Sequence, residues 1–287
     1  MKIAVLGTGL MGRPLAERLK SVGHTVIVYN RTREKADPLR RMGIAVAERP
    51  GDAIREAECV LVMLADAPAI RSVLLGDPAA QELAGRTVIQ MGTIGPGESQ
   101  AIRQEVIAAG GDYLEAPVLG SIAEAKAGTL LIMVGASPEQ FAQWSGLFRE
   151  AGRDARLIGP VGKAAALKLA LNQLIAAEMT AFALSLGLVQ REGVAVEAFM
   201  AVLRESALFA PAFEKKLPRL LARDYANPNF SVRLLLKDVD LFLREAARVG
   251  LNTANLEGVR PILAGALAQG LGEADYSALF NVVNPQA

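Results

Sequence analysis

The sequence predicts an α/β domain with a doubly wound, mostly parallel sheet, followed by an all-helical domain. In roughly the first 160 residues, short apolar runs of strand type alternate with helical patterns, which is typical of a parallel sheet with helices on both faces. After Gly162 the strand-type runs stop and only helical patterns follow. The 287 residues are also more than one hydrophobic core usually holds, so two domains are expected.

The expected strands of the first domain are short and mostly apolar. They are Lys2–Leu6, Thr25–Tyr29, Cys59–Leu64, Thr87–Gln90, Tyr113–Glu115, Leu130–Val134 and Arg156–Ile158. The clearest helices between them are Met11–Ser21, Pro96–Ala109 and Pro138–Glu150. Because such sheets bind ligands beyond the carboxyl ends of their strands, the residues that follow each strand are the first candidates for a binding site.

The boundary between the domains is expected at the Gly159-Pro160-Val161-Gly162 turn, which gives domains of residues 1–161 and 162–287. The expected helices of the second domain are Ala164–Gln190, Val196–Leu203, Ser231–Val249 and Asn255–Gln269. Glycine and proline residues mark the breaks between these helices: Gly193, Pro211, Pro218, Pro228 and Gly250.

The first of these helices, over about residues 163–190, is apolar on nearly all sides. Between Ala164 and Gln190 its only charges are Lys168 and Glu178. We expect it to fall short of a membrane span because four further polar residues interrupt it: Asn172, Gln173, Thr180 and Ser185. Since such a helix is normally buried in protein, we expect it to join the two domains and to contact a second subunit.

Composition disfavours several classes of function. Lys and Arg number 31 and Asp and Glu 30, without a basic block, so neither nucleic acid nor an anionic membrane is expected as a partner. The single cysteine, Cys59, is expected in the core. His24 is the only histidine, so a histidine-based triad is excluded and no metal site is expected. No signal peptide precedes the first strand, so a cytoplasmic protein is expected.

A glycine-rich turn follows the first strand, and its spacing is that of a dinucleotide-binding loop. Gly7 and Gly9 allow a tight turn close to a ligand, and Gly12 lets the next helix pack on the strand. The unpaired N–H groups at the start of that helix suit a pyrophosphate. A purely structural turn is disfavoured because a second strand follows about 20 residues on. Cofactor contacts are therefore expected from Gly7, Gly9, Leu10, Met11 and Gly12.

The end of the second strand favours NADP(H) over NAD(H). A carboxylate there would hydrogen-bond the ribose hydroxyls of NAD and repel a 2′-phosphate, whereas this chain has Asn30, Arg31 and Thr32. Arg31 offers a planar fork to phosphate oxygens. Thr32 is expected to cap a helix that runs to about Met42, whose free N–H groups also favour an anion. The alternative is that Arg31 and Arg33 are solvated surface charges.

Lys168 is the main candidate for chemistry, because it is an isolated charge in an apolar helix. Asn172 follows four positions later and therefore lies on the same face, about one turn along. Burial disfavours the charged ammonium and makes a lysine a better proton donor near neutral pH. The alternative is a lysine whose charged end reaches the surface along its aliphatic stem.

Four segments together resemble the β-hydroxyacid dehydrogenase family. They are Gly7-Thr8-Gly9-Leu10-Met11-Gly12 with Gly23-His24 and Asn30-Arg31-Thr32, the loop from Glu115 to Ser121, Gly159-x-x-Gly162 with Lys168-x-x-x-Asn172, and Leu236-Lys237-Asp238. They span essentially the whole chain in the family's order. The resemblance implies a Rossmann domain, a long interdomain helix, a helical C-terminal domain and an active site in the cleft between the domains.

The resemblance also implies further cofactor contacts and strengthens the assignment of Lys168 as the catalytic residue. Thr93 should lie near the nicotinamide ribose. Met63, Leu64 and Ala65 should lie along the middle of the cofactor.

For the substrate, the resemblance implies that Gly120 and Ser121 bind a carboxylate through backbone N–H groups and the Ser121 hydroxyl. Lys237 would add positive charge beside substrate and cofactor, the alternative being an exposed lysine on an amphipathic helix. The chain departs from the family at Leu119, where a serine is usual, and at Ala164, where a second glycine is usual. The Glu115 and Ser121 variants resemble the glyoxylate and succinic semialdehyde reductase branch, but Leu119 counts against a simple transfer of that substrate.

We therefore expect an NADP-dependent oxidoreductase acting on CH–OH and carbonyl groups. As a reductase it would pass hydride from NADPH to a small carboxylated aldehyde or oxo acid, of the succinic semialdehyde or glyoxylate type. Lys168 would donate the proton, with Asn172 as its partner. The alternatives are a 3-hydroxyisobutyrate-type dehydrogenase, imine reduction, and a non-catalytic NADP-binding protein, the last two disfavoured by Lys168. A homodimer or homotetramer is expected.

Overall fold

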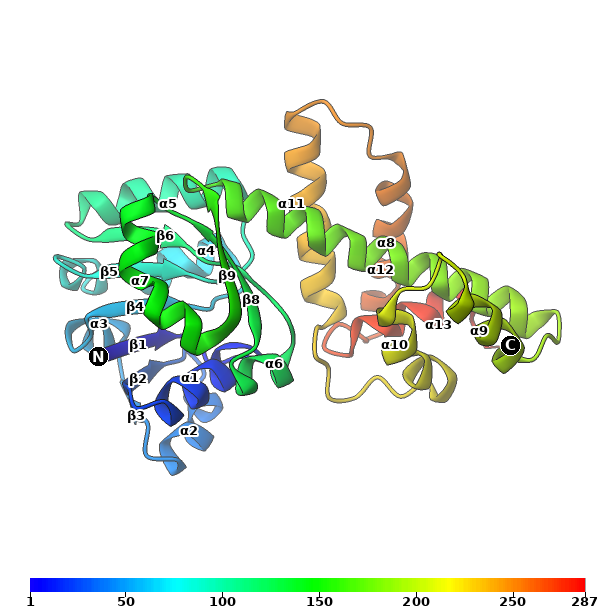
Figure 1. The fold of residues 1–287 in the computed structure, drawn as a ribbon, viewed down its shortest axis with the longest axis horizontal. Helices are drawn as coiled ribbons and strands as arrows, with labels where there is room; N and C mark the ends of the chain where they lie inside the picture. The colour runs from blue at the N-terminus through cyan, green and yellow to red at the C-terminus, as the bar shows by residue number, and fades with distance from the viewer. Residues whose placement is uncertain (287) are drawn as a thin grey trace. The chain divides into compact units, whose positions relative to one another are not determined.

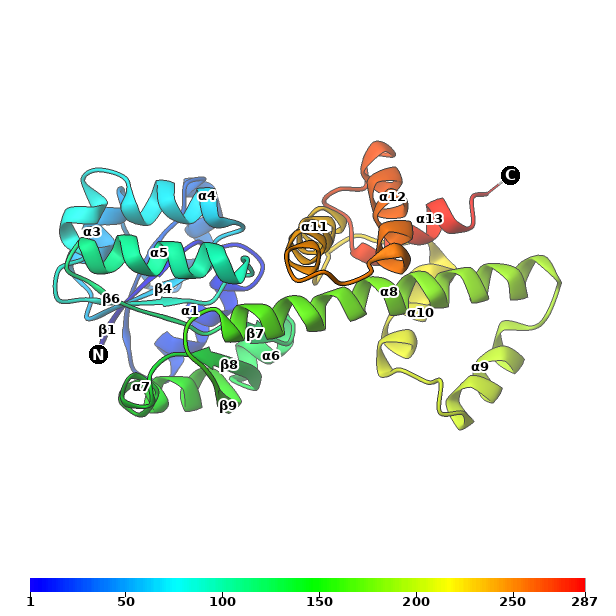
Figure 2. The same cartoon turned by 90° about the horizontal axis from the view of Figure 1, so that it is seen from above.

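The computed structural model describes residues 1–286. The chain forms two compact units, one covering Met1–Leu169 and the other starting at Ala170 (Figures 1 and 2). Helix α8 (Lys163–Arg191) begins in the first unit and continues into the second. The division therefore falls inside this helix, whereas the sequence placed it at the turn that precedes the helix.

The first unit contains a nine-stranded sheet that confirms the predicted fold class. Its strands are β1 (Lys2–Leu6), β2 (Thr25–Tyr29), β3 (Ala45–Val46), β4 (Cys59–Val62), β5 (Thr87–Gln90), β6 (Asp112–Glu115), β7 (Val118–Leu119), β8 (Leu130–Gly135) and β9 (Gly152–Gly159). Strands β3-β2-β1-β4-β5-β6 are parallel neighbours, β8 runs antiparallel to β6 and β7, and β9 pairs with β8. The strand order reverses between β1 and β4, and at such a point an open α/β sheet binds its ligand.

Helices cover both faces of this sheet. They are α1 (Gly12–Ser21), α2 (Asp37–Arg41), α3 (Pro50–Arg55), α4 (Ala67–Ile70), α5 (Pro96–Ala108), α6 (Ile122–Ala127) and α7 (Pro138–Ala151). Alternate residues of β1 enter opposite cores: Ile3 and Val5 pack in one cluster, and Ala4 and Leu6 in another. Burial on both faces explains why the strands read as continuous apolar runs rather than alternating ones.

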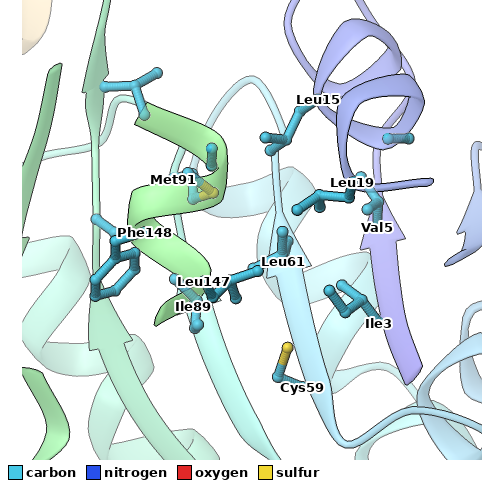
Figure 3. Close-up of a cluster of buried hydrophobic side chains, with 14 of the residues drawn as sticks. Ile3, Val5, Leu15, Leu19, Cys59, Leu61, Ile89, Met91, Leu147 and Phe148 are labelled. Carbon is cyan, nitrogen blue, oxygen red and sulfur yellow. The ribbon is translucent and has the colours of Figure 1, made fainter. Parts of the chain in front are cut away.

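The cluster on the α1 and α7 face of the sheet includes Leu15, Leu19, Leu147 and Phe148 (Figure 3). Cys59 of β4 lies in the same cluster and is fully buried, as predicted. Burial raises the pKa of its thiol to about 12, so it stays protonated and inert near neutral pH.

The second unit is helical. With the remainder of α8 it contains α9 (Val196–Glu205), α10 (Pro211–Ala222), α11 (Val232–Arg248), α12 (Ala254–Ala268) and α13 (Phe280–Val283). Its core holds apolar residues from each of these helices, and the rings of Phe182 and Phe213 stack with centroids 4.5 Å apart.

Helix α8 is long and apolar enough to cross a membrane by length and composition, so the expectation that its polar residues prevent this was wrong. Its most apolar window has a mean hydropathy of 1.4, and 39% of that window is buried inside the chain. One such helix is weak evidence for a membrane span, because the core helix of a soluble protein meets the same criteria. Ala176, Met179, Phe182 and Leu186 of α8 do pack in the core of the second unit.

Some local features differ from the sequence expectations. Pro218 was expected to break a helix but lies inside α10. Pro218 and Glu214, one turn earlier, are both exposed, so water can solvate the carbonyl that loses its hydrogen bond. The two-residue strands β3 and β7 were missed because so short a run carries no periodicity.

Candidate functional site: the nucleotide loop and the polar residues of α8

The glycine-rich loop has the close backbone packing that its spacing predicts. Gly7 has φ +99°, a conformation that favours glycine, and a Cβ at this position would clash with the carbonyl oxygen of Met63. A Cβ at Gly12 would clash with the carbonyl oxygen of Gly7, so α1 packs directly on the end of β1. A Cβ at Gly9 would instead meet nothing within 4 Å. The loop is therefore tight at its base and open at its tip.

The open tip suits a pyrophosphate. No side chain caps the N-terminus of α1. The Arg13 N–H donates to the Gly9 carbonyl at 3.2 Å and Pro14 has no N–H, so the candidate phosphate donors are the backbone N–H groups of residues 10–12. The hydroxyl oxygen of Thr8 is buried and has no hydrogen-bond partner among the described residues. An unpartnered hydroxyl next to an uncapped helix start fits a phosphate-bearing cofactor. Leu10 and Met11, the expected contacts immediately before this start, are exposed and half-buried, respectively.

The residues at the end of β2 have separate roles. The Asn30 side chain accepts a hydrogen bond from the Thr8 N–H at 3.0 Å and donates one to the Thr32 carbonyl at 2.7 Å. Asn30 therefore ties the glycine loop to the segment after β2. Arg31 is exposed, and no carboxylate among residues 1–286 forms a salt bridge with it. Arg33, in contrast, pairs with Glu48 at 3.3 Å.

The helix expected after Thr32 is shorter and less regular than predicted. A 3₁₀ turn covers Arg33–Ala36, and α2 follows only at Asp37–Arg41. Thr32 precedes the 3₁₀ turn, but its side chain makes no capping hydrogen bond. Because the peptide dipoles of a short 3₁₀ turn add up over few residues, Arg31 is the main candidate here for binding a phosphate.

The other expected cofactor contacts lie at the carboxyl ends of neighbouring strands. Met63 follows β4 and its N–H donates to the Leu6 carbonyl at 2.9 Å, so β1 and β4 stay paired up to the ligand edge. Leu64 and Ala65 come next, and Thr93 occupies the corresponding place after β5. A Cβ at Gly92 would meet the Leu64 carbonyl, so these two segments touch. The sheet thus brings these residues to one edge with Gly7 and Asn30.

The loop expected to bind a substrate carboxylate is arranged differently from the prediction. Ser121 caps helix α6, and both its N–H and its hydroxyl donate to Glu124 Oε2, at 2.7 and 2.5 Å. These two donors were expected to face the substrate, but a carboxylate of the chain itself already accepts them. Gly120 has φ +141°, and Leu119 of β7 lies opposite Leu131.

Glu124 was missed at the sequence level although the sequence carries a signal for it. Ser121-x-x-Glu124 at the start of a helix is the capping-box pattern, in which the glutamate returns to the backbone N–H of the first residue.

The polar residues of the second unit form a connected group. The Asn172 amide donates to Asp238 Oδ2 at 2.6 Å, and the Lys237 ammonium lies 2.8 Å from Asp238 Oδ1. Asp238 is 2% exposed and Asn172 3%. Asn172 Oδ1 is buried without a hydrogen-bond partner among the described residues. The Asp238 carboxylate therefore fixes the Asn172 side chain through its Nδ2 group, and Oδ1 of Asn172 remains as an acceptor for another group.

Lys168 lies in α8 one turn before Asn172 and is only 8% exposed. Most lysines are exposed, and a buried ammonium carries a desolvation cost that proteins usually accept only for a specific role. The structure therefore disfavours the alternative of a lysine that extends to the surface. Of the three cationic site residues predicted from the sequence, Arg31, Lys168 and Lys237, Lys168 is the most buried.

Comparison with known proteins agrees with this arrangement. Residues 2–159 match the NAD binding domain of 6-phosphogluconate dehydrogenase, and residues 162–283 match the NAD-binding domain of NADP-dependent 3-hydroxyisobutyrate dehydrogenase. The chain belongs to the β-hydroxyacid dehydrogenase family. It is therefore an NAD(P)-dependent oxidoreductase of the family that acts on hydroxy-acid and oxo groups.

Individual relatives span the whole chain. The chain is 29% identical to 2-hydroxy-3-oxopropionate reductase of Escherichia coli, covering 100% of this chain and 98% of the relative. It is 29% identical to glyoxylate/succinic semialdehyde reductase 1 of Arabidopsis thaliana, covering 99% and 98%. The structure of Mycobacterium tuberculosis 3-hydroxyisobutyrate dehydrogenase with L-serine superimposes with a TM-score of 0.87 at 23% identity, covering 98% of each chain. At that identity the structural match shows the fold alone.

Proposed function

We propose that this protein reduces the carbonyl group of a small carboxylated aldehyde or oxo acid to the hydroxy acid, using NADPH. The observation that carries the proposal is Lys168, a buried lysine one helical turn from the buried amide of Asn172. Two relatives whose names include a reductase of such compounds support the substrate class.

NADPH, when bound, supplies the hydride. The role of Lys168 is then to stabilise the carbonyl oxygen as it gains negative charge and to give it a proton. Asn172 contributes an acceptor, Oδ1, that can orient the ammonium or the hydroxyl of the product. Asp238 keeps the amide in place through its hydrogen bond to Nδ2. No metal is needed for this chemistry, because an ammonium supplies both charge and proton.

The preference for NADPH over NADH rests on the end of β2. Asn30, and not a carboxylate that would repel a 2′-phosphate, stands directly after this strand. Its side chain is hydrogen-bonded to the Thr8 N–H and the Thr32 carbonyl. The exposed guanidinium of Arg31 is then available as a planar partner for phosphate oxygens. The description of the match over residues 162–283 as NADP-dependent agrees with this preference.

Binding of a substrate carboxylate at Ser121 requires that Glu124 be displaced. We predict that Glu124→Ala raises the ratio of kcat/KM for succinic semialdehyde to that for butanal by at least about tenfold, since a hydrogen bond to a charged group is worth about 1.5–3 kcal/mol. Steady-state kinetics with both aldehydes measures this ratio.

A matched control for the lost capping interaction is Gln140→Ala. Gln140 closes the capping box of α7 with Ser137, and its amide also bonds Asp112 at the amino end of β6, opposite the ligand edge. This variant should leave the ratio unchanged. An unchanged ratio in Glu124→Ala would show that the substrate carboxylate does not use the Ser121 donors.

The experiment that tests the proposed function is a panel of carbonyl substrates. NADPH and NADH consumption is followed with succinic semialdehyde, glyoxylate, methylglyoxal and a cyclic imine, and the matching hydroxy acids are tested in reverse. We expect turnover with at least one carboxylated aldehyde or oxo acid, and faster turnover with NADPH than with NADH. Binding of NADPH without oxidation by any carbonyl compound would instead support a non-catalytic NADP-binding protein.

A 3-hydroxyisobutyrate-type dehydrogenase is the second candidate, because the domain over residues 162–283 matches that of such an enzyme. It uses the same lysine and cofactor and differs in substrate and direction. This candidate would be favoured if the kcat/KM for oxidation of 3-hydroxyisobutyrate with NADP⁺ exceeded the values for 4-hydroxybutyrate and for glycolate.

A further inference from the structure

The start of helix α8 is held by a buried carboxylate from a distant strand. Glu115, the last residue of β6, is 1% exposed. Its Oε1 accepts hydrogen bonds from the backbone N–H groups of Gly162, Ala164 and Ala165, at 2.8, 2.9 and 3.0 Å. Gly162 directly precedes the helix, and Ala164 and Ala165 lie in its first turn, where N–H groups have no partner inside the helix.

The second oxygen of the same carboxylate is fixed as well. Ser99 of α5 donates its hydroxyl to Glu115 Oε2 at 2.5 Å, and the Ser99 hydroxyl also lies 2.9 Å from the hydroxyl of Tyr113. Any side chain at Gly135, the neighbour of Glu115 in β8, would collide with the carboxylate. The carboxylate is therefore held in place by α5, β6 and β8 and cannot move independently of the sheet.

Burial and hydrogen bonding act in opposite directions on this carboxyl. Burial raises the pKa of Glu115 above its usual value, and the hydrogen bonds from Ser99 and from the three backbone N–H groups offset only part of that rise. The partial positive charge at the start of a long helix stabilises a nearby carboxylate further. Three donors on one oxygen define the position of the helix end along its axis and its rotation about that axis.

Lys168 follows Ala165 by three residues, which is less than one helical turn. Both residues lie in the part of α8 that belongs to the first unit, the same unit as the glycine-rich loop. If a change at Glu115 displaces the start of the helix, Lys168 is therefore displaced with it, because less than one helical turn separates the two points.

We propose that Glu115, with Ser99 behind it, is the positioning residue for Lys168: it sets where the ammonium stands relative to the nucleotide edge of the sheet. This inference rests on the proposed function, in which Lys168 is the proton donor. Glu115 touches the backbone of α8 and acts on the reaction only through that helix.

A double-mutant cycle on kcat tests this inference. Glu115→Asp shortens the side chain by one methylene, so the carboxylate keeps its charge but can no longer reach all of its donors without moving the helix. We expect this change to lower kcat at least about tenfold in the native background, since displacements on the order of 1 Å can cost about 100-fold in rate. The KM for NADPH should change less than about twofold, because the glycine loop is untouched.

In a Lys168→Ala background the same change should lower kcat less than about twofold, because residues that act as a unit are not additive. Residual turnover is measured as product formed under single-turnover conditions. An equal fold loss in both backgrounds would overturn the inference, and so would an unchanged kcat in Glu115→Asp alone. Near-normal turnover in Lys168→Ala alone would instead overturn the proposed role of Lys168.

Two further variants keep the test informative if Glu115→Asp does not fold. Ser99→Ala removes the hydrogen bond to Oε2, together with the contact to the Tyr113 hydroxyl, and leaves the three backbone donors in place. We expect a kcat loss of about threefold that again disappears when Lys168 is absent. Glu115→Gln keeps the length and one acceptor oxygen, and should retain more activity than Glu115→Asp. Lower activity in Glu115→Gln than in Glu115→Asp would show that charge, and not position, is what Glu115 supplies.

Discussion

Replacement of Lys168 by alanine is expected to lower kcat by at least about 100-fold, which is the lower end of what general acid catalysis contributes. The buried ammonium is removed, and the developing charge on the carbonyl oxygen then has neither a positive partner nor a proton donor at that position. NADPH affinity should stay within about threefold of the native value, because the glycine-rich loop and the end of β2 are unaltered. Turnover at saturating NADPH, together with a fluorescence titration of NADPH, measures both quantities.

Lys163→Ala is the matched control for this variant. Lys163 lies in the same helix, but its side chain is exposed, so its removal changes the helix charge equally without touching the buried position. We expect kcat within about twofold of the native value for this variant. If Lys168→Ala retained near-normal turnover, the proton would have to come from another group, and the proposed mechanism would be wrong.

Arg31→Asp is expected to raise the KM for NADPH at least about tenfold more than the KM for NADH, since a hydrogen bond between charged groups is worth about 1.5–3 kcal/mol. The new carboxylate also repels a 2′-phosphate, whereas it can accept hydrogen bonds from the ribose hydroxyls of NADH. Because a loop holds Arg31 at the surface, the substitution should leave the fold intact. Steady-state kinetics with each cofactor, at saturating carbonyl substrate, gives both values.

Arg41→Asp controls for the change in net charge. Arg41 is exposed at the end of α2, and its substitution alters the charge of the unit by the same amount as Arg31→Asp. It should change the two KM values equally and only slightly. If Arg31→Asp raised the KM for NADPH and the KM for NADH equally, Arg31 would not bind the 2′-phosphate, and it would not explain a preference for NADPH.

The sequence predicted the elements that depend on long apolar patterns. Strands β1, β2 and β5 match their predicted bounds, because each contains consecutive apolar residues with strand propensity and lies between clear turn residues. The long helix α8 was also found, because its pattern extends over many turns. Its potential to span a membrane was underestimated, since a few polar residues do not lower the mean hydropathy of so long a helix far enough.

The sequence was less informative about which polar groups form hydrogen bonds with one another. Ser121 was expected to face a substrate, and only the structure shows that Glu124 takes its two donors. Glu115 lies in the predicted substrate loop, but its three backbone donors lie 47 to 50 positions further along the chain, beyond any local pattern. Asp238 lies in the Leu236-Lys237-Asp238 segment that resembles the family, yet its hydrogen bond with Asn172 spans 66 positions. Contacts at such separations follow from tertiary packing, and one sequence without its relatives does not reveal them.

Transfer of a labelled hydride tests the central claim most directly. NADPH carrying deuterium at the transferable position of carbon 4 is incubated with the protein and succinic semialdehyde or glyoxylate, and the hydroxy acid is analysed by mass spectrometry. We predict one deuterium on the carbinol carbon, formed in step with NADP⁺, and a rate that falls at least about 100-fold in Lys168→Ala. Hydroxy acid without deuterium, or label transfer at the native rate in that variant, would contradict the account.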